Sequence, residues 1–226
     1  MKPNWRLAED ALSSIRVEGN ERNEEVSLFG YADGLHCVGL GTDAAVFTYD
    51  PVPEVAYKVY TDHALYKKER ERDVYLQLKG IPYFPAYYGE GSNYLAIGYE
   101  PGPTLLDCLL QGIPVPPVVI SDVEDARRLV RERGLNPRDI HLKNVVVQNG
   151  RAKVIDVSEY MLEGDDRRWE HLMWAYQMFY PSMEGKKIPL WLINSVKSGY
   201  KKLDQANLNV EEYAQRISRL FSRFMK

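Results

Sequence analysis

The sequence predicts an α+β protein of two lobes, a β-rich first lobe and a mainly helical second lobe. Residues 26–60 consist of short segments rich in β-branched and aromatic residues, separated by turn residues. A strongly charged segment with one apolar stripe follows at residues 62–78, which is typical of a helix packed on a sheet. Beyond the proline-rich residues 112–117, the chain is helical in texture apart from one short hairpin. We therefore expect a mostly antiparallel sheet with one helix, over residues 26–100, to pack on a helical lobe.

The strands of the first lobe are expected at VSLFGY, GLHCVGLG, AAVFTY and VAYKVY, with two more between residues 80 and 100. Asp33-Gly34 and the Asp50-Pro51 region supply turns between them. The helix at residues 62–78 is expected to bury Leu65, Val74, Tyr75 and Leu78.

In the second lobe, a helix is expected over residues 122–133, with Ser121-Asp122 as its N-cap. NVVV and AKVIDV flank a turn at residues 148–150 and predict the hairpin. The rest of the chain, from Asp165 on, is also expected to be helical. The last segment, residues 213–224, has an apolar stripe that is more typical of a docked terminal helix than of a membrane anchor.

Composition and charge argue against several classes of protein. The chain has 226 residues and a formal net charge of −3, so its balance does not indicate a nucleic-acid or membrane binder. No run approaches the ~18 apolar residues of a membrane span, and the polar start is not a signal peptide. Cys37 and Cys108 lack metal-ligand spacing and are expected to be reduced thiols. We expect a cytoplasmic protein with neither nucleic acid nor membrane as a partner.

Two glycines lie in the turn Gly39-Leu40-Gly41, which precedes the strand containing Val46. Glycines let backbone N–H groups approach phosphate oxygens without a Cβ in the way. An ordinary hairpin has the same pattern, so the turn alone does not decide between the two interpretations.

Lys58 follows Val-Ala-Tyr in a strand-like run, and its ammonium is a candidate to bind the α- and β-phosphates of ATP. The small Ala56 would leave room for adenine. Alternatively, Lys58 is simply the exposed position of an alternating strand. A carboxylate on the following helix would balance its charge. Glu71 shares a face with the apolar stripe and is preferred over Glu69, which is the competing candidate.

The strongest pattern is Arg-Asp-Ile-His-Leu-Lys-Asn at residues 138–144, followed by a short hairpin that ends near Asp156. A hairpin this short returns the chain to its start, so Asn144 and Asp156 are expected to share one Mg²⁺ or Mn²⁺ ion. Asp139 would then point at the group that accepts the phosphoryl group. Plain turn formation is the alternative interpretation of these polar residues.

Together these elements resemble the protein-kinase signature set in order and spacing, over residues 35–160. YLAIGYEPGPTLLDCL is similar to the kinase hinge, which implies that Ile97 is the gatekeeper and that the Gly98 and Glu100 backbones face adenine. More narrowly, the chain resembles small serine/threonine kinases of Bacillus-type bacteria. The resemblance implies an extension at residues 1–28, an N-lobe and hinge at 29–102, and a C-lobe at 103–226.

Several residues depart from that family pattern. Ala44 replaces the third glycine, and Pro137 stands where His precedes Arg-Asp. His141 is a feature shared with aminoglycoside- and choline-kinase-like enzymes. The metal motif reads Asp156-Val157-Ser158, and no Ala-Pro-Glu motif follows. The segment that docks peptides in ordinary kinases is therefore missing or rebuilt, which affects the substrate more than the nucleotide site.

The expected function is ATP-dependent phosphoryl transfer to a hydroxyl, as in a serine/threonine protein kinase, with self-phosphorylation included. Lys58 and Glu71 would orient the phosphates, and Asn144 and Asp156 would hold the metal. Asp139 would take the proton of the acceptor hydroxyl. The alternatives are a small-molecule kinase of the aminoglycoside or choline-kinase type and a regulatory pseudokinase that binds nucleotide.

Overall fold

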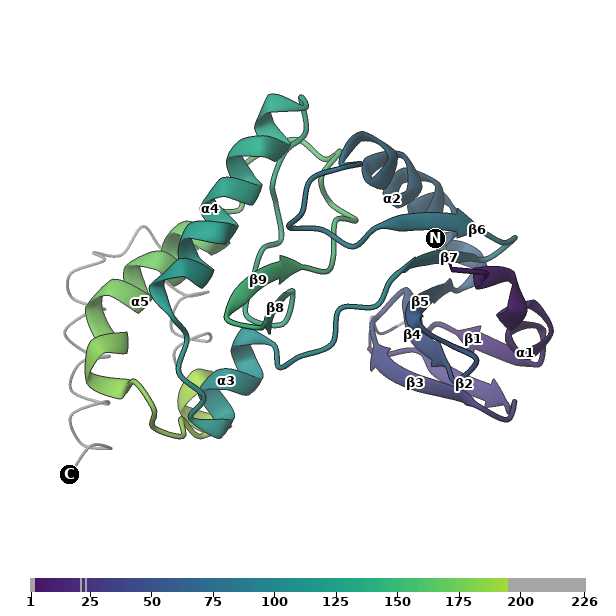
Figure 1. Cartoon of the computed structure of the whole chain (residues 1–226), viewed down its shortest axis with the longest axis horizontal. Coiled ribbons are helices and arrows are strands. Elements are labelled where there is room, and N and C mark those ends of the chain that lie inside the picture. The colour runs from purple at the N-terminus through teal and green to yellow at the C-terminus, as the bar shows by residue number, and fades with distance from the viewer. Residues whose placement is uncertain (1–2, 21, 23, 195–226) are drawn as a thin grey trace.

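The computed structural model describes residues 3–20, 22 and 24–194, and within them it confirms the α+β class. Figure 1 shows a β-rich part, which contains strands β1 to β7 and helix α2, beside a mainly helical part that holds the short hairpin β8–β9. The stripe expected at residues 213–224 lies outside the described residues.

The regular elements of the described residues follow one another in the order predicted for the core of the chain. They are, in sequence, η1 (Trp5–Ala8), α1 (Glu9–Ser13), β1 (Ile15–Glu18), β2 (Ser27–Gly30), β3 (Leu35–Leu40), β4 (Ala44–Tyr49), β5 (Val52–Tyr60), η2 (Asp62–Ala64), α2 (Leu65–Gln77), β6 (Tyr87–Glu90), β7 (Tyr94–Gly98), α3 (Leu105–Gln111), α4 (Pro117–Glu132), β8 (Val145–Gln148), β9 (Arg151–Val154) and α5 (Arg168–Met183).

A five-stranded antiparallel sheet in the order β3-β4-β5-β7-β6 is the centre of the β-rich part. Its middle strand, β5, alternates between two cores because successive side chains of a strand point to opposite faces. Val55, Tyr57 and Val59 belong to a core on one face. Ala56 and Tyr60 belong to the larger core on the other face. This alternation decides which way each polar residue of β5 points.

Helix α2 lies against the larger core, as the stripe predicted. Val74 and Tyr75 of the helix, and Leu78 just after it, are buried in that core, while Leu65 is partly buried. The same core contains residues of the helical part, such as Val130 and Val154, so apolar packing is continuous between the two parts. Burial of each large side chain there stabilises the fold by about 1.5–3 kcal/mol.

The N-terminal segment covers the other face of the sheet. It begins with η1 and α1 and continues as the strand β1, which pairs with β2. Trp5, Leu12 and Val17 pack in the core on this face. The hydroxyl of Tyr57 donates a hydrogen bond to the carbonyl of Trp5 at 2.8 Å. The division of the chain at residue 28 stays a prediction, and β2 runs across that position.

In the second part, the predicted start of one helix is wrong and a second helix was not predicted. Helix α4 begins at Pro117, five residues before the start expected from Ser121, because proline is well suited to the first turn of a helix. The hydroxyl of Ser121 contacts the Pro117 carbonyl at 3.4 Å and does not cap the helix. Helix α3 was not predicted. It starts with a capping box in which Thr104 and Asp107 each satisfy the backbone N–H of the other.

The β8–β9 hairpin is present as expected, with Val145 paired to Val154. Asn149 and Gly150 both have positive φ, as a tight two-residue hairpin turn requires. Asp122 braces this hairpin against α4. Its carboxylate accepts hydrogen bonds from the Arg151 side chain at 2.6 and 2.7 Å and from the Ala152 N–H at 3.0 Å.

Cys37 is exposed and Cys108 is buried, and neither is in a disulfide. No helix among the described residues is long and apolar enough to span a membrane.

The Asp122 brace should contribute measurably to stability. We expect Asp122→Asn to lower the free energy of unfolding by about 1–2 kcal/mol, because the charge-assisted bonds to Arg151 and Ala152 weaken. Hydrogen bonds from Arg151 lower the pKa of Asp122. Its stabilising effect is therefore present above the unfolded pKa of about 4 and is lost as the pH falls through the lower folded pKa.

Urea unfolding at several pH values would measure this effect. Glu132→Gln is the matched control on the same helix, because its pair with Arg128 is exposed. The control should change stability by less than about 0.5 kcal/mol. If the difference between wild type and Asp122→Asn does not shrink at low pH, the brace does not depend on the charge of Asp122.

Candidate active site

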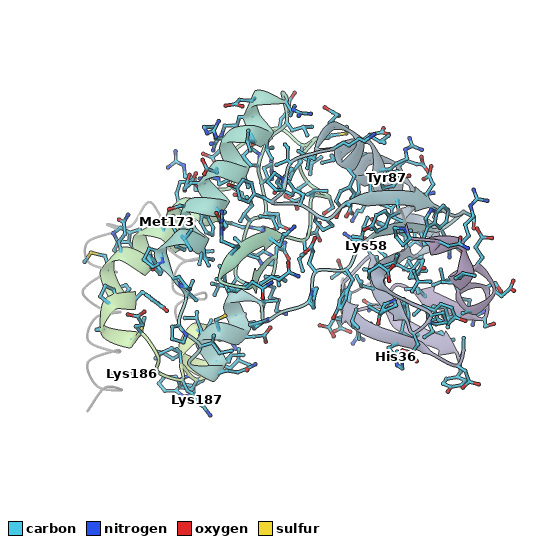
Figure 2. All side chains as sticks on the ribbon, viewed as in Figure 1. His36, Lys58, Tyr87, Met173, Lys186 and Lys187 are labelled. Atoms are coloured by element: carbon cyan, nitrogen blue, oxygen red, sulfur yellow. The ribbon has the colours of Figure 1, made fainter. Side chains whose placement is uncertain are left out.

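Lys58 is enclosed between the sheet and helix α2, on the same face of β5 as Ala56 and Tyr60. Its Nζ donates to both carboxylate oxygens of Glu71, at 2.7 and 2.9 Å. The side chain of Lys58 is 12% exposed and that of Glu71 is fully buried. Figure 2 shows Lys58 near the middle of the molecule. Lys58 is thus not a solvent-facing position of an alternating strand.

Of the two carboxylates considered as partners for Lys58, Glu71 makes the contact. The hydroxyl of Tyr60 donates a second hydrogen bond to Glu71, at 2.7 Å. Glu69 instead pairs with Arg72 and Lys68 on the outer side of α2. The face of α2 that carries Val74 also carries Glu71, and this shared face brings the carboxylate to the sheet.

A second carboxylate, Asp156, lies 3.4 Å from the Lys58 ammonium and is one-third exposed. It comes two residues after β9, which ends at Val154 and so stops short of the expected strand end at Asp156. Its Oδ1 accepts a hydrogen bond from the Ser158 N–H at 3.0 Å. Lys58 therefore connects the sheet to a carboxylate of the helical part.

Burial and charge act in opposite directions on these three groups. Burial by itself lowers the pKa of Lys58, but Asp156 and Glu71 outweigh it and the pKa is raised. Burial raises the pKa of Glu71, and Lys58 only partly opposes it. Burial also acts to raise the pKa of Asp156, but Lys58 and the Ser158 N–H reverse the direction and lower it. Lys58 and Asp156 are thus held in their charged forms.

The loop before β8 has an unusual backbone at Asp139, whose φ is +53°. The side-chain amide of Asn144 donates to the Asp139 carbonyl at 3.0 Å and so fastens the loop. The Asn144 carbonyl accepts from the Ile155 N–H at 2.9 Å, beside Asp156. The loop and the far end of the hairpin are therefore adjacent, as the spacing predicted.

The carboxylate of Asp139 contacts His141 and also Arg168, which the sequence did not single out. Oδ1 of Asp139 pairs with Nη1 of Arg168, the first residue of α5. Nε2 of His141 lies 3.6 Å from the same oxygen. The Asp139 N–H donates to the Asp166 carboxylate at 2.7 Å. The charged run at residues 165–168 was the available signal, but no pattern in it indicates a contact 27 or 29 residues upstream.

The glycine turn is tied down on two sides. The Gly41 N–H donates to the Ala44 carbonyl at 2.9 Å and closes the turn between β3 and β4. The Gly41 carbonyl accepts from the Val26 N–H at 2.9 Å. Asp43 pairs with Lys67 of α2 at 2.6 Å. The N-terminal segment and α2 therefore both hold this turn.

The two glycines differ in what the fold requires of them. A Cβ on Gly39 would meet only the Val46 side chain, at 3.7 Å, which is an ordinary contact. A Cβ on Gly41 would lie 3.2 Å from the Ala44 carbonyl, which is tight. Neither has a positive φ. Leu40, between them, is exposed. Neither the φ of Gly39 nor the space around it therefore requires glycine, and its one local irregularity is a register shift of the β3–β4 pair between Cys37 and Gly39.

The segment expected to act as the hinge follows β7. Ala56 and Ile97 are both buried and are cross-strand partners, so they form one wall together. The Gly98 N–H donates to the Ala86 carbonyl at 2.7 Å and is committed to the fold. The Glu100 side chain lies 3.3 Å from Lys153 of β9. Burial raises the pKa of Glu100, against the opposing effect of Lys153.

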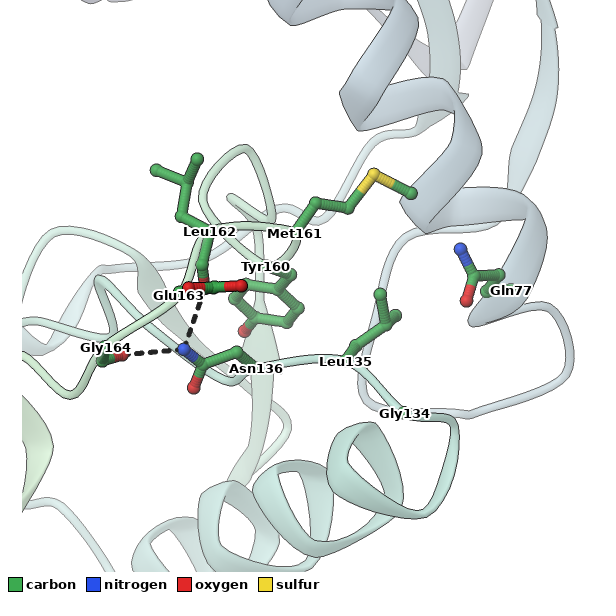
Figure 3. A pocket seen from close by; sticks show the side chains of 9 residues that line it. All are labelled: Gln77, Gly134, Leu135, Asn136, Tyr160, Met161, Leu162, Glu163 and Gly164. Carbon is green, nitrogen blue, oxygen red and sulfur yellow. Dashed lines mark hydrogen bonds between the residues drawn. The ribbon is translucent and has the colours of Figure 1, made fainter.

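Beside the segment that follows Asp156 is a cavity of about 520 Å³ (Figure 3). The side-chain amide of Asn136 crosses to this segment and donates to the carbonyls of Leu162 and Gly164, at 2.8 and 2.7 Å. None of Lys58, Asp139 and Asp156 is among its lining residues, so it is separate from the charged cluster. The lining residues are Gln77, Gly134, Leu135, Asn136, Tyr160, Met161, Leu162, Glu163 and Gly164.

Asn144 and Asp156 are the two residues expected to hold a cation, and both carry an oxygen on the side chain. Within the described part of the chain, no group of three or more His, Cys, Asp or Glu side chains could hold a metal ion. Mg²⁺ does not need such a cage, because it keeps several waters and is commonly bound by one or two carboxylates together with phosphate oxygens. The donor set fits Mg²⁺ bound with a nucleotide better than a structural metal.

An antiparallel sheet with a buried lysine, a helix glutamate that holds it, and an aspartate and asparagine on the adjacent hairpin is the arrangement of protein-kinase-like proteins. No model of a known protein family matches the chain. The chain is 31% identical over 185 residues to the "Putative serine/threonine-protein kinase YrzF" of Bacillus subtilis (strain 168), covering 80% of this chain and 82% of that protein. The chain belongs to the protein-kinase-like family that this relative represents. The likeness supports kinase-type phosphoryl transfer in general.

The buried Lys58–Glu71 pair predicts that Glu71 contributes much more to the free energy of unfolding than Glu69, a nearby carboxylate of α2. We expect Glu71→Ala to lower the free energy of unfolding by about 3 kcal/mol, because Lys58 and Tyr60 both lose a buried acceptor. Glu69→Ala, the matched control, should cost less than about 1 kcal/mol, because the Glu69 side chain is 47% exposed and Lys68 and Arg72 keep Glu90 as a partner. Urea unfolding of the two variants would measure both values. Equal losses would contradict the assignment of Glu71 as the partner that stabilises Lys58.

Proposed function

We propose that the protein is an ATP-dependent phosphotransferase of the serine/threonine protein kinase type, with a bilobal kinase-like fold. The observation that carries the proposal is Lys58, held by Glu71 and lying 3.4 Å from Asp156. A buried ammonium between two carboxylates of different parts of the chain is a costly arrangement for stability alone. It is well suited to a site where the charge must meet phosphate oxygens.

The glycine turn supports a role in phosphate binding. Glycine at position 39 is not explained by a positive φ or by a steric conflict, since its Cβ would have ordinary contacts. Close approach of a phosphate to the backbone would explain it. Leu40 and Gly41 would then cover the ATP phosphates together with Gly39, and Val46 would lie at the base of this loop. Ala56 and Ile97 would enclose adenine, and the Gly98 carbonyl and Glu100 backbone would be its hydrogen-bond partners.

Asn144 and Asp156 would hold the Mg²⁺ or Mn²⁺ ion that accompanies ATP. The bound ion would supply charge neutralisation for the phosphate oxygens. Lys58 keeps Asp156 ionised, as its lowered pKa indicates, and an ionised carboxylate is the form that binds a cation. Asn144 fixes the loop through the Asp139 carbonyl, so the same residue would serve both the metal and the loop.

Asp139 would receive the proton of the acceptor hydroxyl while the hydroxyl oxygen attacks the γ-phosphate. Catalysis in such reactions is mostly positioning and electrostatics, because the transition state is loose. Asp139 is suited to this role because its backbone is fixed by both Asn144 and Asp166. A requirement for ATP agrees with a cytoplasmic location, which we propose together with the absence of nucleic-acid and membrane partners.

A small-molecule kinase is the second candidate. His141 lies 3.6 Å from Asp139, and residues 157–167 alone connect Asp156 to α5. This short connection leaves little chain for docking a long peptide in the usual way. Incubation with labelled ATP and Mg²⁺ would distinguish the candidates. Label on protein supports the first and label on a metabolite pool the second, whereas nucleotide binding without transfer would indicate a pseudokinase.

Removal of the Asp139 carboxylate tests the proposed reaction directly. We expect Asp139→Ala to lower the rate of phosphoryl transfer at least about 100-fold, the usual contribution of a positioned general base. ATP binding should be retained, because Lys58 and Asp156 remain. Asp165→Asn is the control for loss of a nearby acidic charge and should keep most of the activity. Transfer at the wild-type rate by Asp139→Ala would rule out the assigned role.

Gly39→Ala tests the glycine turn separately. We expect its free energy of unfolding to stay within about 1 kcal/mol of wild type, since alanine is tolerated in a strand and has room there. ATP affinity should fall about tenfold or more, because the added Cβ would occupy space needed by a phosphate. Titration calorimetry with ATP and Mg²⁺ measures the affinity. Unchanged affinity would separate this turn from nucleotide binding.

A further inference from the structure

The side chain of Arg168 is paired with Asp139, the carboxylate that is proposed to take the proton of the acceptor hydroxyl. Arg168 is the first residue of α5, and its Nη1 pairs with Oδ1 of Asp139. The acceptor hydroxyl needs access to this carboxylate to hand over its proton. Arg168 therefore lies where the acceptor would bind, although it is not among the residues of the nucleotide site.

A local network fixes the position of Arg168 near the acceptor site. Asp166 accepts a hydrogen bond from the Asp139 N–H at 2.7 Å and another from the Arg168 N–H at 3.1 Å. Nε of Arg168 lies 3.6 Å from the same Asp166 carboxylate. Asp139 and Arg167 both have positive φ, at +53° and +48°. The start of α5 and the catalytic loop therefore hold each other in defined conformations.

The pairing of Arg168 with Asp139 is exchangeable. The Arg168 side chain is 47% exposed, and ion pairs that reach solvent contribute little net stability. Arg138 differs, because it is bound to Glu159 and to the carbonyls of Glu163 and Gly164 and has no such freedom. If Arg168 leaves Asp139, an anionic group on the incoming acceptor can take its place as partner. A neutral or basic acceptor offers no such exchange.

We propose that Arg168 selects acidic peptide acceptors, in which a carboxylate lies next to the serine or threonine that is phosphorylated. The inference rests on the function proposed above and names its substrate class. In the transfer, the acceptor oxygen forms a bond to the γ-phosphorus, the bond from that phosphorus to ADP breaks, and the hydroxyl proton passes to Asp139. Arg168 meanwhile binds the neighbouring carboxylate of the peptide.

The surroundings of Arg168 favour a peptide over a compact molecule. Residues 161–165, which lead to α5, are exposed along their whole length, so a short extended stretch of peptide can lie beside them without the long docking segment of ordinary kinases. Lys143, in the loop that contains Asp139, is exposed as well. Cations spread along an open surface fit a chain with acidic residues, and such charge complementarity sets specificity more than total affinity.

Two serine peptides that differ at one position, Glu or Gln directly after the serine, test the proposal with the full chain. We expect wild type to phosphorylate the Glu peptide about tenfold more efficiently by kcat/KM, the effect of one charged hydrogen bond. Arg168→Gln should remove this preference by changing kcat/KM for both peptides. The Glu peptide becomes a poorer substrate, and the Gln peptide a better one because Asp139 is no longer covered.

Arg167→Gln is the matched control, because it removes the same charge one residue away, where no contact with Asp139 is made. It should keep the preference. A loss of activity on both peptides with Arg168→Gln would indicate a merely structural role and overturn the proposal. So would wild-type activity that does not distinguish the peptides, or ATP turnover with transfer to neither. If wild type makes no ADP at all with Mg²⁺, the proposed function itself fails instead.

Discussion

The contact of Lys58 with Glu71 is the constraint on which the rest of the site depends. β5 must present Lys58 to the face that carries the larger core, and α2 must turn Glu71 toward the same face. Both conditions follow from simple periodicities, two residues in the strand and 3.6 in the helix. Once the pair forms, helix and sheet are locked in one register. Asp156 then has a defined cation to approach from the helical part.

The helical part contributes its polar groups through one short hairpin and one fixed loop. The β8–β9 hairpin begins just after Asn144 and returns the chain to it, so that the Ile155 N–H donates to the Asn144 carbonyl. Asp122 fastens this hairpin to α4. The loop at Asp139 takes a conformation that most residues avoid, and hydrogen bonds on both sides maintain it. Strain of this kind is typical of functional loops. The hairpin and the loop that carry the charged groups are therefore each held in place by hydrogen bonds.

Local patterns accounted for most elements near the site, because strand alternation and the apolar stripe of α2 are short-range signals. The α+β class, the helix after β5 and the β8–β9 hairpin could be predicted in this way. β1 could not, since Ile15–Glu18 becomes a strand only by pairing with β2. Ser121 resembled a cap, but Pro117 allowed α4 to start earlier. Arg168 and Asp166 reach Asp139 through tertiary packing alone, which no spacing along the chain encodes.

The N-terminal segment has a consequence for how the glycine turn can move. Its Val26 N–H is bonded to the Gly41 carbonyl, and its Trp5 and Leu12 are packed beneath the sheet. A hinge motion that lifts the turn must therefore stretch this bond or carry the segment along. The first residues act as a mechanical tether, and their attachment sets how freely the turn opens for a ligand to enter or leave.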